Sequence, residues 1–296
     1  DEAGKIQKSP LPPSYPNLDA TPPPDFEDIP FEKYLVPEGI ANLQTSRGCY
    51  YGKCTFCGDS FRRNFRMRNP ALVYEDIKGI HEKVGVRFFL FWDSLAPPKT
   101  LRTVAEGIER DKLPIYWFAE TKFERPYVDK QLIETLYSGG GRFLQFGFES
   151  GSQRVLDLID KGNDLARVDT ILENMNDVGL KAGVSWFIGF PGETPEDFEE
   201  TRALLADLPV SYFHVFPFSV RKNTPAERMD TQLPPEVKQE RGATLRSLSQ
   251  RKQRMFQERF LGRTRTVLCE APKADGRMGG FTDNYLRVEL KGGFPE

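Results

Sequence analysis

Three cysteines lie within nine residues in the stretch "TSRGCYYGKCTFCGDS", residues 45–60. They are Cys49, Cys54 and Cys57, and the only other cysteine of the chain, Cys269, lies far downstream. Cysteine thiolates are soft ligands that select zinc or an iron–sulfur cluster. The stretch therefore predicts a metal or cluster site carried on one tight loop.

The number of thiols in the loop leaves several interpretations open. A structural zinc site requires four closed ligands, and the two histidines, His81 and His214, are isolated in the sequence. The spacing also matches the start of a plant-type ferredoxin, which would need Cys269 as its fourth ligand. A [4Fe–4S] cluster held by three thiolates instead leaves one iron open for a substrate or cofactor. We favour this cluster, with zinc and a loop of buried thiols as alternatives.

The cysteine loop follows the first of six short apolar segments that are typical of strands and alternate with amphipathic helices. The expected strands are residues 40–46, 86–93, 115–121, 142–150, 182–190 and 211–219. The expected helices are residues 70–85, 99–112, 128–140, 164–179 and 194–208. This alternation predicts an α/β fold with a parallel sheet, either open or closed into a partial (β/α)6 TIM-like barrel, short of the eight units of a complete barrel. Such folds bind ligands at the carboxyl ends of their strands.

The two ends of the chain differ from this core in composition. Residues 1–38 are rich in proline and favour an extended linker or arm. After the core, residues 39–233, comes a basic connecting helix at residues 234–260. Residues 261–296 contain short alternating segments separated by Asp-Gly and Gly-Gly, which predict a small antiparallel β domain.

Composition restricts the surroundings in which the protein works. The 296 residues carry a formal net charge of −2, so no global field attracts nucleic acid or an anionic membrane. No apolar run is long enough to suggest a membrane span, and no signal-peptide pattern opens the chain. Four cysteines, three of them clustered, do not form a disulfide framework. We expect a reducing, cytoplasmic protein with no membrane association.

The cysteine loop resembles that of radical S-adenosylmethionine (radical SAM) enzymes. The usual spacing in that family is Cys, three residues, Cys, two residues, Cys, with an aromatic residue before the last cysteine. In "CYYGKCTFC" Phe56 matches this aromatic, whereas the first gap holds four residues. The resemblance extends over about residues 40–225 and implies a [4Fe–4S] cluster on Cys49, Cys54 and Cys57.

The resemblance also implies residues that bind SAM, all near strand ends. "FLFWDS" would hold the methionine end through Trp92, Asp93 and Ser94, with Asp93 accepting from the ammonium group. In "FGFESGS", Glu149 and Ser150 would face the ribose or methionine, and Lys161 could pair with the carboxylate. The adenine would lie along "WFIGFPGET" and "VFPFS". The residues implied there are Ile188, Gly189 and Phe216.

Each of these residues also has an ordinary structural interpretation. Asp93 could cap the next helix, and Glu149 could form a structural ion pair. Lys161 could be a solvated surface lysine. Ile188 and Phe216 could belong to the core.

The resemblance further implies a mechanism. An electron from a donor such as flavodoxin or ferredoxin would reach the cluster and cleave the sulfonium bond of SAM. The product is a 5′-deoxyadenosyl radical, which abstracts a hydrogen atom from the substrate. A non-catalytic iron–sulfur electron carrier is the alternative from another functional class.

Two groups of radical SAM enzymes share different parts of this sequence. The tail, residues 206–292, resembles tRNA methylthiotransferases, with "ERFLGRTRTVLCE" and "GGFTDNYLRVEL" similar to their tRNA-binding TRAM domain, a small β-barrel. That family carries three further cysteines in a preceding domain, whereas no cysteine stands before Cys49 here. Glu149, Lys161 and the proline-rich segment resemble instead cobalamin-dependent radical SAM enzymes.

We therefore expect modification of a tRNA nucleobase, with tRNA bound through the C-terminal region. The alternative is a cobalamin-type reaction on a small molecule or peptide.

Overall fold

The computed structural model describes residues 17–34, 36, 38–58, 65–270 and 277–290. Its centre is a parallel sheet of five strands in the order β1-β4-β5-β6-β7. The strands are β1 (Ile40–Leu43), β4 (Phe88–Phe91), β5 (Tyr116–Thr121), β6 (Gly141–Glu149) and β7 (Lys181–Trp186). Every neighbouring pair is parallel, which confirms the predicted α/β class.

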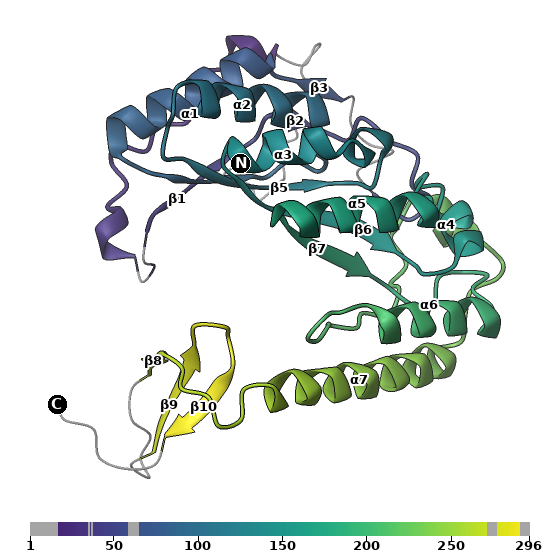
Figure 1. The fold of residues 1–296 in the computed structure, drawn as a ribbon. Coiled ribbons are helices and arrows are strands. Elements are labelled where there is room, and N and C mark those ends of the chain that lie inside the picture. Colours follow the sequence, from purple (N-terminus) through teal and green to yellow (C-terminus); the bar gives the residue numbers. More distant parts are fainter. Residues whose placement is uncertain (1–16, 35, 37, 59–64, 271–276, 291–296) are drawn as a thin grey trace, which may run out of the picture.

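Helices cover one face of this sheet (Figure 1). They are α1 (Pro70–Val84), α2 (Pro98–Arg110), α3 (Lys130–Ser138) and α5 (Leu165–Val178). The remaining helices are α4 (Gln153–Ile159), α6 (Pro195–Asp207) and α7 (Pro235–Glu258), with 3-10 turns at Leu18–Ala20, Phe31–Lys33, Arg125–Val128 and Pro225–Arg228. Of these, α4 was not predicted, because its seven residues span only two turns and give little periodicity.

Side chains alternate between the two faces of the sheet, as the pleat requires. Phe89, Trp117 and Phe146 point to the helical layer and are fully buried. On the opposite face, half-buried rings touch across neighbouring strands, with centroids 5.3 Å apart for Phe88 and Tyr116 and 6.5 Å apart for Phe118 and Phe143. The sheet therefore presents an aromatic layer away from its helices.

The sixth predicted strand, residues 211–219, joins the sheet at a single point. One isolated parallel bridge links Ile188 to Pro217. Two hydrogen bonds support it, from the Ile188 amide to the Phe216 carbonyl at 3.3 Å and from the Phe218 amide to the Ile188 carbonyl at 2.7 Å. The partial barrel thus has five regular strands and a bridged sixth segment.

The chain after the core forms a long helix and a small sheet. Helix α7 packs through Leu245 and Leu248 against Leu205 of α6, and the sheet lies beyond its far end (Figure 1). That sheet is antiparallel, in the order β10-β9-β8, and its strands are β8 (Val267–Cys269), β9 (Met278–Thr282) and β10 (Arg287–Leu290).

The three strands form an open sheet over the described part of the predicted β domain, of which residues 271–276 and 291–296 lie outside the description. The predicted Gly-Gly turn is wrong, because Gly279 and Gly280 lie inside β9. A Cβ atom on Gly280 would stand 2.5 Å from the Leu268 carbonyl oxygen, so this position requires a glycine. None of the helices within the described ranges is long and apolar enough to cross a membrane.

Candidate active site

A short hairpin closes the base of the cysteine loop. Strand β2 (Ser46–Arg47) directly precedes the loop and pairs antiparallel with β3 (Arg66–Met67). Gly48 and Gly52 adopt positive φ angles of 81° and 61°, a conformation that costs glycine little and other residues more. The loop is therefore a sharply turned excursion at the carboxyl end of the sheet, as the sequence predicted.

Thr55 anchors the middle of the loop to two distant segments. Its amide donates to the Ile159 carbonyl at 2.8 Å, and its hydroxyl donates to the Leu158 carbonyl at 3.0 Å. Its own carbonyl accepts from the Ala226 amide at 3.0 Å. These contacts hold the loop between the end of α4 and the chain that follows the bridged sixth segment.

The three clustered thiols are free and lie within electrostatic reach of one another. Cys54 is buried, whereas Cys49 and Cys57 are half-buried. The pKa of Cys54 is raised to about 12, chiefly by burial; Lys161 opposes the rise, and the neighbouring Cys57 and Cys49 contribute to it. Deprotonated thiols at this point therefore require positive charge nearby.

A cavity of about 790 Å³ opens beside Cys57. It joins the cysteine loop, through Phe56 and Cys57, to the carboxyl ends of the last strands. Its other walls are Gly58, Glu149, Ser185, Trp186, Phe187, Phe216, Pro217, Phe218, Ser219, Arg221 and Lys222. The rings of Phe56 and Phe187 meet edge to face with centroids 5.0 Å apart. Four residues predicted from the sequence, Phe56, Cys57, Glu149 and Phe216, thus come together at one cavity.

Glu149 and Lys161 form a buried ion pair next to this cavity. The Lys161 ammonium donates to the Glu149 carboxylate, and the two side chains are 14% and 8% exposed. Glu149 has a φ of 76°, a strained conformation for a non-glycine residue and one that clusters at functional sites. A Cβ atom on Gly147 would lie 1.9 Å from the Lys161 nitrogen, so a glycine here makes room for the pair.

Lys122 is a buried cation that the sequence analysis missed. It directly follows β5 and is 5% exposed. Its nitrogen lies 4.0 Å from the centroid of the Tyr51 ring, inside the cysteine loop, and it forms no ion pair with any residue of the described ranges. Burial lowers its pKa, and Glu124 and Cys54 oppose that effect. The same rule that selected other strand ends, a polar residue after an apolar strand, would have found it.

Asp93 faces the strand that leads into the cysteine loop. Its carboxylate accepts from the Thr45 amide at 3.3 Å, the Thr45 hydroxyl at 3.2 Å and the Ser46 hydroxyl at 2.6 Å, and also from the Ser46 amide. Burial raises its pKa, and the bonds from Ser46 and Thr45 oppose the rise. This geometry favours a positioning role; contact of Asp93 with the ammonium group of SAM stays a prediction.

The structure does not bring the remaining predicted residues to the cavity beside Cys57. Trp92 lines a different cavity, and Ser94 is exposed. Ser150 is 1% exposed and its hydroxyl lies 3.3 Å from that of Thr201. Ile188 packs in the core next to α7, and Gly189 donates its amide to the Glu193 carboxylate at 3.0 Å. Their contacts with SAM therefore stay predictions without a shared pocket.

A family model described as "Radical SAM superfamily" matches residues 43–205. The chain belongs to the radical SAM superfamily. The matched segment begins in β1, includes the cysteine loop and ends in α6, so it coincides with the sheet and its helices.

Curated proteins of two kinds are similar to this chain in sequence. An uncharacterized methyltransferase of Pyrococcus horikoshii is 30% identical over 71% of this chain and 46% of its own length. The threonylcarbamoyladenosine tRNA methylthiotransferase MtaB of Aquifex aeolicus is 30% identical over 88% of this chain and 65% of its own length. The chain thus spans about half the length of such curated relatives.

Solved structures of radical SAM enzymes share the fold. TsrM from Kitasatospora setae, solved with cobalamin and a [4Fe–4S] cluster, superposes with a TM-score of 0.55 at 16% identity, over 64% of this chain and 36% of its own. The cobalamin-dependent radical enzyme OxsB superposes with a TM-score of 0.55 at 16% identity, over 93% of this chain and 42% of its own.

The predicted cofactors, a [4Fe–4S] cluster and SAM, are those of the family. The donor set fits the cluster, because Cys49, Cys54 and Cys57 are free, adjacent and electrostatically coupled. Within the described ranges, no three His, Cys, Asp or Glu side chains stand in a finished metal-binding arrangement. The loop therefore fits by the identity and number of its ligands rather than as a preformed cage.

Proposed function

We propose that this radical SAM enzyme modifies a nucleobase of tRNA. Cys49, Cys54 and Cys57 would hold the [4Fe–4S] cluster at the mouth of the cavity that Glu149 and Phe216 line. With an electron donor such as flavodoxin or ferredoxin, the cluster and SAM would supply a 5′-deoxyadenosyl radical. The residues of the chain would orient SAM and exclude water from the radical.

The observation that carries the proposal is the extent of similarity to MtaB. It covers 88% of this chain and so reaches well beyond residues 43–205, which the family model matches. A second named tRNA-modifying relative, the tRNA-2-methylthio-N(6)-dimethylallyladenosine synthase of Zymomonas mobilis, is 34% identical over 46% of this chain. Both names support tRNA as the class of substrate.

The C-terminal region has the chemistry to bind RNA. We infer that residues 234–260 and 261–296 act as a connecting helix and a TRAM-like unit behind the core at residues 39–233. Two arginines already lie over aromatic rings there, Arg265 at 4.6 Å from the Phe260 centroid and Arg287 at 5.2 Å from that of Phe281. Arginine and aromatic side chains together bind phosphates and stack on bases.

SAM cleavage is the first experiment. The anaerobically reconstituted, reduced chain should form 5′-deoxyadenosine from SAM, and Cys54→Ala should lose both the cluster absorbance and this product. The matched control is Cys269→Ala, which alters the exposed cysteine in β8 and should keep both. A wild-type protein that takes up the cluster but forms no 5′-deoxyadenosine would identify an electron carrier instead.

RNA binding is the second experiment. A triple variant, Arg254→Ala with Arg259→Ala and Arg263→Ala, should weaken tRNA binding and reduce its salt dependence by roughly 0.7–0.9 in log–log slope for each lost phosphate contact. Arg102→Ala, on the exposed side of α2, is the matched control. Unchanged tRNA binding in the triple variant would refute the assignment of the tail.

A cobalamin-type reaction on a small molecule or peptide is the second candidate. The Glu149–Lys161 pair favours it, because the sequence resembles cobalamin-dependent enzymes at these two positions. Formation of 5′-deoxyadenosine without any tRNA binding by the chain would select this candidate over the first.

A further inference from the structure

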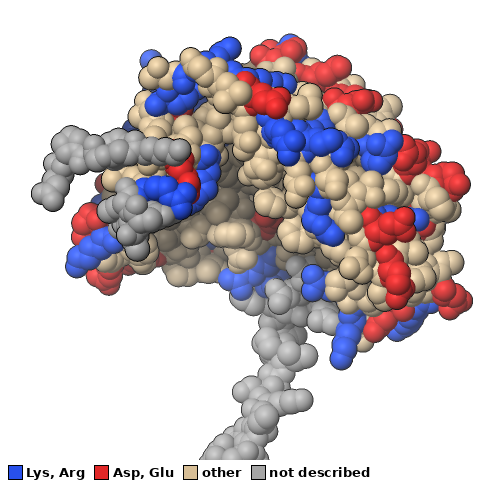
Figure 2. Space-filling model, turned by 90° about the horizontal axis from the view of Figure 1, so that it is seen from below, with Lys and Arg blue, Asp and Glu red and all other residues tan. Residues whose placement is uncertain are grey.

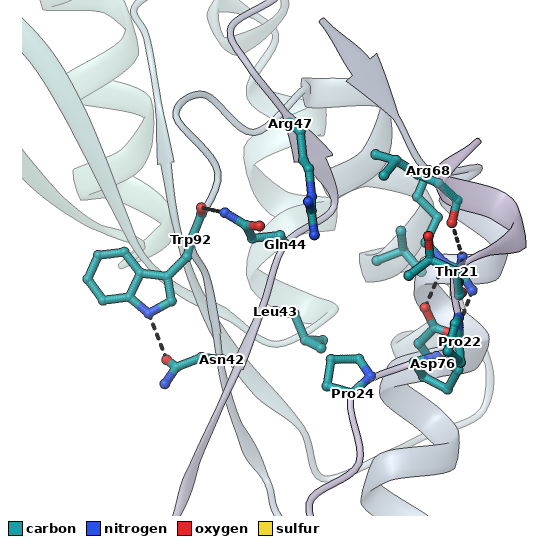
Figure 3. Close-up of a pocket in the computed structure, with 13 residues that line it drawn as sticks. Thr21, Pro22, Pro24, Asn42, Leu43, Gln44, Arg47, Arg68, Asp76 and Trp92 are labelled. Carbon is teal, nitrogen blue, oxygen red and sulfur yellow. Dashed lines mark hydrogen bonds and ion pairs between the residues drawn. The ribbon is translucent and has the colours of Figure 1, made fainter. Parts of the chain in front are cut away.

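A second cavity, of about 420 Å³, lies along the free edge of β1 and contains none of the cysteines (Figure 3). Its walls come from the N-terminal segment, from the ends of β1 and β4, from β2, from the residue that follows β3, and from α1. The residues are Leu18, Thr21, Pro22, Pro23, Pro24, Asn42, Leu43, Gln44, Arg47, Arg68, Val73, Asp76 and Trp92. Of the residues expected to contact SAM, Trp92 alone is part of this lining.

Trp92 places an exposed, fixed indole at the rim of the cavity, on the side of Asn42. Its side chain is 54% exposed, yet the indole N–H donates to Asn42 Oδ1 at 2.9 Å (Figure 3). The Trp92 carbonyl in turn accepts from the Gln44 amide group at 3.2 Å. An exposed indole held in one orientation loses little entropy when a planar group stacks on it.

Arg47 gives the cavity an uncompensated positive charge. The other arginine of the lining, Arg68, is engaged by the Thr21 carbonyl at 2.9 Å and by the Asp76 carboxylate at 2.7 Å. The side chain of Arg47 is exposed and forms no hydrogen bond or ion pair with any residue that the structure describes. Two arginines and one aspartate leave one positive charge in the lining, and it is the free guanidinium of Arg47. Guanidinium groups bind phosphate oxygens in a bidentate manner.

The cavity reaches the carboxyl ends of β1 and β4, and the cysteine loop lies at the same end of the sheet. Arg47 stands two residues before Cys49, and Trp92 directly follows β4. A single-stranded RNA whose target base enters the cavity beside Cys57 would have neighbouring nucleotides to accommodate. Stacking on an aromatic ring and a phosphate contact to arginine are the two means by which proteins hold such nucleotides.

We propose that this cavity binds a nucleotide of the RNA substrate, with its base on the Trp92 indole and its phosphate on Arg47. The proposal rests on the proposed function and adds a subsite to it. A single anion would need only Arg47, whereas a nucleotide uses both the exposed ring and the free guanidinium.

The test is equilibrium binding of a fluorescently labelled, short single-stranded RNA to the full-length chain. Trp92→Ala should weaken binding by about 5- to 150-fold, the range expected for loss of one stacked base, and Trp92→Phe should restore most of it. Arg47→Ala should reduce the log–log salt slope by about 0.7, the value for one phosphate contact of a single strand. Arg102→Ala is the matched surface control, and thermal unfolding of every variant establishes that it is folded.

Four outcomes separate this proposal from the proposed function. Weakened binding in both variants, with Arg102→Ala unchanged, supports the subsite. Wild-type affinity and salt slope in folded Trp92→Ala and Arg47→Ala overturn it, while RNA binding through the C-terminal arginines stands. A loss in Arg47→Ala alone, equal for inorganic phosphate and RNA, reduces the cavity to an anion site and overturns the nucleotide. No RNA binding by the wild-type chain removes both proposals.

Discussion

Replacing Asp93 by alanine separates two roles for this carboxylate, positioning of the cysteine loop and contact with SAM. Asp93 is 3% exposed, and its oxygens receive the backbone amides of Thr45 and Ser46, which are 0% and 1% exposed. Alanine would leave both amides buried without an acceptor. The hydroxyls of Thr45 and Ser46 can rotate towards other acceptors, but the two backbone amides cannot. Each buried amide left without an acceptor costs about 1–3 kcal/mol. We therefore expect Asp93→Ala to lower the free energy of unfolding by about 2–6 kcal/mol.

The assay combines three measurements on the same preparation of Asp93→Ala. Urea unfolding of the apoprotein gives the free energy, iron analysis after reconstitution gives the cluster content, and equilibrium dialysis gives SAM affinity. Because Ser46 lies three residues before Cys49, the positioning role predicts that stability and iron content fall together. Asp93→Asn, which keeps one acceptor oxygen, should lie between alanine and the wild type.

One result would refute this reasoning about Asp93. If Asp93→Ala unfolds within 1 kcal/mol of the wild type and takes up a full complement of iron but no longer binds SAM, the carboxylate contacts SAM. The hydrogen bonds to Thr45 and Ser46 would then be incidental to the loop.

Three further variants probe the surroundings of the site. Arg241→Met would leave Glu193, whose side chain is 3% exposed, without its partner, and should cost about 3–5 kcal/mol in urea unfolding; a double variant with Glu193→Gln that recovers none of this loss would contradict the ion pair. Gly147→Ala should push Lys161 away from Glu149 and cost about 1–3 kcal/mol by overpacking; a crystal structure with the pair intact would argue against this. Lys122→Met should stabilise the apoprotein at pH 7, since burial lowers the Lys122 pKa and its charge opposes folding. That gain should shrink as pH rises through the lowered pKa towards 10.5, and a pH-independent difference would contradict the assignment.

The repeating pattern of the core was readable from the sequence because each strand and helix has its own periodicity. The start of helix α6 was also readable. The Thr194 hydroxyl accepts from the Asp197 amide, and the Asp197 carboxylate accepts from the Thr194 amide, which together form a capping box. The sixth segment pairs less than its apolar pattern predicted, because within the described residues it meets the sheet only at the bridge between Ile188 and Pro217. An apolar pattern indicates burial, whereas strand pairing also depends on how far two segments run side by side.

The clustering of the three cysteines was also readable, but the protein partners of single side chains were not. Lys161 is expected to pair with a SAM carboxylate, and in the structure it forms an ion pair with Glu149. Trp92 is expected to hold the methionine end of SAM, and in the structure its indole donates to Asn42 on the edge strand. These choices depend on which strands become neighbours and on how each turn leaves the sheet, and a single sequence carries no such information.

The composition likewise did not reveal how charged side chains are distributed over the surface. A net charge of −2 hides local concentrations of both signs. Figure 2 shows a hollowed face with Lys and Arg side chains beside the hollow. Local positive charge of this kind can bind phosphates even on a chain with slight negative net charge.

The anchoring of Thr55 has a consequence for how the protein matures. Its loop is held by carbonyls at the end of α4 and by the amide of Ala226, so residues from three distant parts of the sequence must be in place together. On the ribosome, the cysteines emerge long before Ala226. The loop can therefore be fully anchored only after most of the chain has been synthesised, and we expect iron and sulfide to be delivered to it late, after the sheet has formed. A chain stalled before Ala226 would display its thiols on an unfastened loop.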